Sequence, residues 1–198
     1  MILFVGDLLG SFAIASIYAE RHRPSTMVLL GHIGPWHPKG LAGVFHAGID
    51  IAWVATDSFL HAWRDLADST DHRMRLGCLD GRVAMIGDHL VAGAYGLLPD
   101  TIRRLSRQPA DILLTVEEAP SYCPGGGEQL DRLAGAMGAR MIICGQAESY
   151  VAEHRRLGLK VVGVGPGQAV DEFGELIEPG PERQPAGLHV SEEWRRVR

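Results

Sequence analysis

Apolar residues in the chain gather in short runs that stop at glycine or at a polar residue. The first run covers 2–6 and stops at Asp7, and apolar residues with helical spacing then follow over 11–22. A second apolar run covers 26–30 and ends at Gly31. Strand, helix and strand in this order form a βαβ unit, so we predict that the first two strands are parallel.

The same alternation of apolar runs and turn residues continues along the chain. Further strands are predicted over 49–55, 111–116, 141–144 and 159–164, and helices over 59–66, 99–105 and 128–137. Two runs at 82–86 and 90–94 flank a Gly-Asp turn, which predicts a hairpin that opens a second sheet. We also expect 172–177 to pair with the strand over 159–164.

The length and the absence of an obvious linker predict one domain over 1–198. A chain of 198 residues is long enough to bury a sizeable core. Residues 178–187 are rich in proline and glycine, so we expect 178–198 to form a tail.

Composition and charge narrow the classes of partner. The formal net charge of −5 argues against a dedicated nucleic-acid binder. No apolar stretch approaches the roughly 20 residues that span a bilayer, so no membrane partner is expected. The first apolar run lacks a basic flank and stops at Asp7, unlike a signal peptide. The 3 cysteines have no metal-type spacing, which favours a reducing compartment, and we expect a cytoplasmic protein.

Polar residues follow several of the predicted strands, where open α/β sheets bind ligands. These strand ends read Gly6-Asp7-Leu8-Leu9-Gly10, Gly31-His32, Thr56-Asp57-Ser58, Val116-Glu117 and Gly145-Gln146-Ala147-Glu148. On its own, Asp7 is equally well explained as a turn and cap residue for the helix that follows. The strand ends gain weight as a candidate site only when they are considered together.

In order and spacing, these strand ends resemble the calcineurin-like metallophosphoesterase family, which places GDxHG, GD, GNH(D/E), a strand-terminal histidine and GHxH there. Residues 79–96 resemble its central hairpin, and Asp111-Ile112-Leu113-Leu114-Thr115 resembles its DILLTHxxP segment. The similarity covers about residues 1–165. It implies an α/β (α+β) fold, a four-layer metallophosphoesterase-like sandwich in which two mixed β-sheets are flanked by helices.

The resemblance also implies a phosphoesterase centre in which two metal ions clamp the attacking and leaving oxygens. The implied ligand positions are 7, 9, 32, 56, 116, 146 and 148, with a histidine at 57. Here they hold Asp7, Leu9, His32, Thr56, Val116, Gln146 and Glu148, with Asp57, and only Asp7 matches. Leu9 and Val116 offer no lone pair to a cation, and an Asp57 carboxylate would repel a phosphate oxygen. A dinuclear centre is therefore not expected, although a shift of one residue at 116 would place Glu117 there.

Three functions remain open at this stage. The leading hypothesis is a non-catalytic scaffold or regulatory protein that binds a protein partner or forms a homo-oligomer, with no catalytic or cofactor-binding residue. The alternative is a metal-dependent phosphoric ester hydrolase with a rebuilt, mononuclear site. Its candidate ligands for one Zn, Mn or Fe ion are Asp7, His32, Asp57 and Glu148, with Glu117 as a further candidate. The third is a sensor that binds a small ligand, without metal, in the pocket that the active site of the family would occupy.

Overall fold

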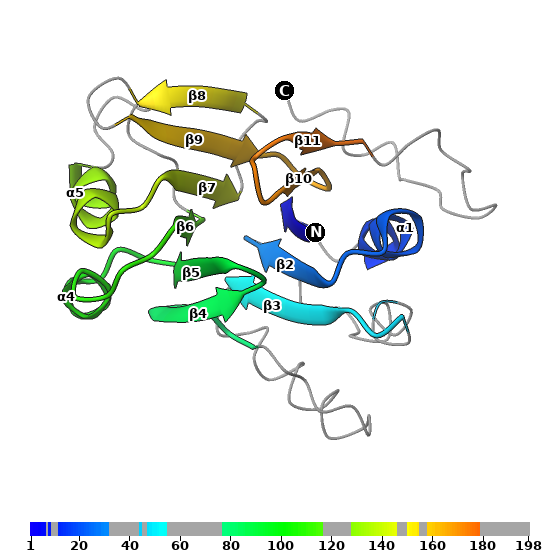
Figure 1. The fold of residues 1–198 in the computed structure, drawn as a ribbon, viewed down its shortest axis with the longest axis horizontal. Helices are drawn as coiled ribbons and strands as arrows, with labels where there is room; N and C mark the ends of the chain where they lie inside the picture. Colours follow the sequence, from blue (N-terminus) through cyan, green and yellow to red (C-terminus); the bar gives the residue numbers. More distant parts are fainter. Residues whose placement is uncertain are drawn as a thin grey trace, which may run out of the picture.

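The computed structural model describes residues 1–6, 8, 12–31, 44, 47–54, 77–116, 128–145, 150–154 and 158–178. Within these residues the chain forms two β-sheets and the helices that cover them (Figure 1). The helices are α1 (Phe12–His22), α4 (Pro99–Leu105) and α5 (Glu128–Met137). None of these helices is long and apolar enough to cross a membrane.

The first sheet has the strand order β11-β10-β1-β2-β3. Its strands are β1 (Ile2–Gly6), β2 (Thr26–Leu30), β3 (Asp50–Val54), β10 (Ala169–Asp171) and β11 (Leu176–Ile177). β1, β2 and β3 are parallel, with Phe4, Val28 and Ala52 side by side. The prediction of a parallel βαβ unit at the start of the chain is therefore confirmed.

The second sheet has the strand order β4-β5-β6-β7-β9-β8. Its strands are β4 (Arg82–Ile86), β5 (His89–Ala94), β6 (Ile112–Thr115), β7 (Met141–Gly145), β8 (Tyr150–His154) and β9 (Leu159–Val164). β5, β6, β7 and β9 are parallel, while β4 and β8 pair antiparallel at the two ends. The predicted hairpin does open a second sheet.

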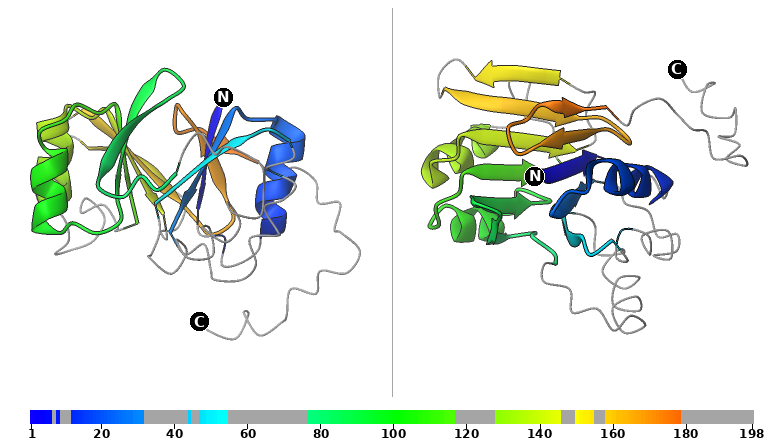
Figure 2. Two further views of the ribbon diagram at one scale, coloured as in Figure 1. Left: turned by 90° about the horizontal axis from the view of Figure 1, so that it is seen from below. Right: turned by 45° about the vertical axis from the view of Figure 1, so that its right-hand side comes forward.

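The two sheets pack face to face, with α1 on the outer face of the first and α4 and α5 on the outer face of the second (Figure 2, left). Successive side chains of a strand point to opposite faces, so each strand contributes to two layers of core. Phe4 and Val28 lie in the core between the sheets, whereas Leu3 and Met27 pack in the core beneath α1. The expected architecture of two mixed sheets flanked by helices is confirmed at this level.

The pairing expected for 172–177 is wrong. β11 pairs with β10, and β10 pairs with β1 in the first sheet rather than with β9. The Asp171 carboxylate accepts hydrogen bonds from the backbone N–H groups of Phe173 and Glu175, both at 2.9 Å. This side chain turns the chain back on itself, so that β11 returns along β10.

Two other features differ from the sequence analysis or lie beyond the reach of the structure. The apolar pattern does not predict the strands β8 and β10, which the structure contains. The helix expected over 59–66 and most of the tail expected over 178–198 lie outside the described residues.

Candidate functional site

The parallel strands of both sheets end at the same side of the sandwich, which we name the carboxyl edge and define by Gly6, Gly31, Val54, Val116 and Gly145. A Cβ atom placed on Gly145 at the end of β7 would lie 2.9 Å from Leu30 Cβ at the end of β2. Strand ends that belong to different sheets are therefore in direct contact here. This is the edge of an α/β fold at which ligand sites are built.

Gly6 lies at the carboxyl edge, where the end of β1 in the first sheet closely approaches the end of β9 in the second. Its N–H donates to the Gln168 carbonyl at 2.9 Å, and its own carbonyl accepts from Gly167 N–H at 2.8 Å. A Cβ atom on Gly6 would press against the Val164 carbonyl oxygen and lie 2.7 Å from that of Gly165. Both obstacles are backbone atoms, so glycine is the residue that permits this approach.

A short segment, 77–81, bridges the two sheets on the other flank of the carboxyl edge. Leu79 N–H donates to the Trp53 carbonyl in β3 at 2.9 Å, and Gly81 N–H donates to the Gly93 carbonyl in β5 at 2.8 Å. The Asp80 carboxylate then accepts from Tyr95 N–H at 2.7 Å, directly after β5. The ends of β3 and β5 are thereby fixed relative to each other.

The metal-ligand candidates Asp7, His32, Asp57, Glu117 and Glu148 all lie outside the described residues. Each comes within three residues of a described strand end at the carboxyl edge. The structure brings together the strands that precede these residues. That their side chains converge on one site stays a prediction. Among the described residues, no group of three or more His, Cys, Asp or Glu side chains is placed to hold a metal ion.

Val116 is the one position of the implied ligand set that the structure describes. Its side chain is 7% exposed and belongs to the core between the sheets, together with Leu114 and Ile143. An alkyl group has no lone pair, so this position offers no donor to a metal ion. The side chain at position 116 therefore lacks the metal ligand that the resemblance implies there, and Glu117, the further candidate, lies outside the described residues.

Leu98 lies at the same edge and was missed by the sequence analysis. Because β5 and β6 are parallel, the helix α4 that connects them begins at the carboxyl edge. Leu98 is the N-cap residue of α4, makes no side-chain capping bond, and is 67% exposed. Its signal is visible in the sequence: a leucine precedes Pro99, where a helix start favours Ser, Thr, Asp or Asn.

Two described groups have displaced pKa values, and neither is one of the residues that define the carboxyl edge. Burial raises the pKa of Tyr18 to about 12, and its hydroxyl donates to the Ile177 carbonyl at 3.2 Å. The pKa of Asp111 is lowered, chiefly by the hydrogen bond that its carboxylate accepts from Leu90 N–H at 2.8 Å, and also by Arg140. Asp111 lies at the start of β6, at the opposite, amino edge of the sheet.

No protein-family model and no curated protein sequence matches this chain. Solved structures match it in fold. The crystal structure of TT1561 of Thermus thermophilus aligns with a TM-score of 0.65 and 14% identity, covering 89% of this chain and 96% of that one. A second crystal structure aligns with a TM-score of 0.64 and 12% identity, covering 89% of this chain and 98% of the other. At these identities the likeness shows the fold alone.

Proposed function

We propose that this protein is a metallophosphoesterase-like sandwich with a degenerate active site, and that it acts as a non-catalytic scaffold or regulatory protein. The carboxyl edge, which would carry the active site of such a fold, binds a protein partner instead. The arrangement of two mixed sheets flanked by helices supports this proposal, as do the strand ends that meet at one edge.

The observation that carries the proposal is the apolar character of Val116. A two-metal centre depends on protein donor atoms that hold both ions in place, and the resemblance implies one of these donors at position 116. Val116 supplies a buried alkyl group at that place and contributes to the core between the sheets. Its contribution is to packing, so this position stabilises the edge and offers nothing to a metal ion.

Leu98 supports the proposal that the carboxyl edge binds a protein partner. An exposed leucine at a helix N-cap leaves the helix without a side-chain cap, which costs about 1 kcal/mol relative to Ser, Thr, Asp or Asn. A partner that covers the exposed Leu98 side chain would remove its apolar surface from water, which favours binding. Its place beside the carboxyl edge puts this contact where a substrate would bind in an enzyme of the fold.

A hydrolysis assay tests the loss of catalysis. We expect no turnover of a phosphomonoester or a phosphodiester nitrophenyl substrate above buffer, with Mn or Zn added. Turnover that is lost in Asp7→Ala but kept in Asp88→Ala would refute the proposal and establish the hydrolase. Asp88 is a suitable control because it is exposed in the β4–β5 turn, next to the amino end of β1.

Affinity capture with full-length variants tests the partner surface. We expect Leu98→Asp to lose the proteins that the wild type captures, even though an N-cap aspartate stabilises α4 by about 1 kcal/mol. Phe173→Ser is the matched control, because Phe173 is 66% exposed and lies in the β10–β11 turn at the amino edge. Equal capture by wild type and Leu98→Asp would show that the carboxyl edge is not the partner surface.

A further inference from the structure

We propose that a cavity at the C-terminal end of α1 binds small organic acids that carry an apolar body, such as an aromatic or branched aliphatic carboxylate. The cavity lies where α1 passes into β2, at the amino edge of the first sheet. It is therefore separate from the carboxyl edge, and this inference goes beyond the proposed function.

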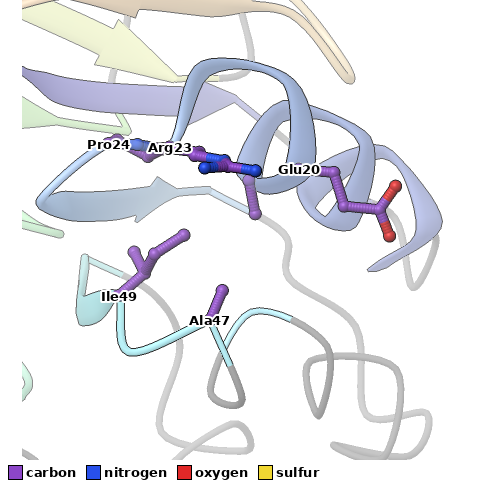
Figure 3. A pocket seen from close by; sticks show the side chains of 6 residues that line it. Glu20, Arg23, Pro24, Ala47 and Ile49 are labelled. Atoms are coloured by element: carbon purple, nitrogen blue, oxygen red, sulfur yellow. The ribbon is translucent and has the colours of Figure 1, made fainter.

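The cavity has the size and lining of a small-molecule site. Its volume is ≈ 450 Å³, and sites for small ligands occupy roughly 300–1,000 Å³. The residues that line it are Ala19, Glu20, Arg23, Pro24, Ala47 and Ile49. Figure 3 shows Glu20, Arg23 and Pro24 on one side and Ala47 and Ile49 on the other.

Four of the six lining residues are apolar, and three of these are buried, whereas Ala47 is exposed. Ala19 is 1% exposed, Ile49 is 6% exposed, and Pro24 is also buried. A ligand with an aromatic or branched apolar group would cover this surface and remove it from water, which favours binding.

The backbone of Arg23 is unusual in a way that points to its side chain. Arg23 N–H donates to the Ala19 carbonyl at 3.0 Å, which is the bond that ends a helix with a left-handed residue. Glycine is favoured there, yet Arg23 has φ 46° and is the one non-glycine residue with positive φ among those the structure describes. An arginine kept in a conformation that favours glycine suggests a use for its guanidinium.

The charges at the cavity favour an anion. Within the described part of the chain, the Arg23 guanidinium makes no ion pair with a carboxylate. The nearby Glu20 carboxylate is turned away from it (Figure 3). A guanidinium can bind a carboxylate through two parallel N–H···O bonds. One cation beside an apolar wall therefore matches a ligand that has one carboxylate and an apolar body.

Calorimetric titration of the full chain with indole-3-acetate tests this site, with neutral indole as the matched probe. We expect saturable binding of indole-3-acetate and binding of indole that is at least about tenfold weaker. Arg23→Gln should weaken the binding of indole-3-acetate by about tenfold, whereas Arg82→Gln, an exposed arginine on β4, should not change it. Glu20→Gln removes a negative charge from the rim and should strengthen binding about twofold or more.

Arg23→Gly separates binding from folding. Glycine relieves the left-handed conformation, so this variant should keep or raise the melting temperature while losing binding as Arg23→Gln does. No saturable binding by the wild type would overturn the inference. So would equal affinities for indole and indole-3-acetate, or unchanged binding in Arg23→Gln.

Discussion

Gly6→Ala is predicted to destabilise the protein strongly, because it forces apart the two sheets at the carboxyl edge. The added methyl group would press against the Val164 carbonyl oxygen and lie 2.7 Å from the Gly165 carbonyl oxygen. Backbone atoms cannot rotate away as a side chain does, so relief requires the end of β9 to move. Overpacking of this kind costs about 1–3 kcal/mol, and we expect a value near the upper limit, about 3 kcal/mol.

Thermal unfolding measures this cost. For a chain of this length, each kcal/mol shifts the melting temperature by about 2–4 °C, so Gly6→Ala should lower it by about 6–12 °C. Gly135→Ala is the matched control with the opposite sign. Gly135 lies in α5 with nothing within 4 Å of an added Cβ, and alanine there should raise the helix stability by about 1 kcal/mol. An unchanged melting temperature in Gly6→Ala would refute the close contact between the strand ends.

Two further variants test the contacts of the two ionisable groups whose pKa values are shifted. Tyr18→Phe should cost about 1 kcal/mol, because it removes the hydrogen bond to the Ile177 carbonyl from a buried site. Burial raises the pKa of Tyr18 to about 12, so the stabilisation by neutral Tyr18 is present below about pH 10 and is lost as the pH rises towards 12. Alkaline absorbance titration should show one late-titrating tyrosine in the wild type, and this tyrosine should be missing from Tyr18→Phe. Asp111→Asn should lower the stability at pH 7, because the carboxylate accepts from Leu90 N–H and pairs with Arg140. The pKa of Asp111 is lowered in the folded protein, so the stabilisation by its carboxylate is present above about pH 4 and is lost as the pH falls through the lowered pKa. Urea unfolding should show that the free energies of unfolding of the wild type and Asp111→Asn converge as the pH falls. A difference that stays constant with pH would contradict the assignment.

The regular elements were predictable because their signals are local. The apolar run of β1, the helical spacing of α1 and the Gly-Asp turn between β4 and β5 each lie within a few residues of sequence. The pairing of β11 and the position of the segment 77–81 were not predictable in the same way. The course of β11 depends on hydrogen bonds to the Asp171 carboxylate. The position of the segment 77–81 depends on its pairing with Trp53 in the first sheet and Gly93 in the second, and neither residue is adjacent to the segment in the sequence.

The candidate site was predictable in its place more than in its chemistry. Polar residues after apolar strands indicated the carboxyl edge, and the structure shows that these strands end together. The sequence pattern marks Gly6 and Gly145 as turn residues, whereas the structure explains them by the contact between sheets, a constraint that no local pattern carries. Leu98 escaped notice because a single apolar residue before a helix is conspicuous only once its exposure is known.

Metal content, measured by elemental mass spectrometry on tag-free protein after incubation with Mn or Zn, is the decisive quantity for the degenerate active site. A non-catalytic carboxyl edge predicts far less than one ion per chain in the wild type, and no difference from Asp7→Ala, His32→Ala or the control Asp88→Ala. A near-stoichiometric ion in the wild type and in Asp88→Ala that is lost in both Asp7→Ala and His32→Ala would contradict it and establish a rebuilt metal site.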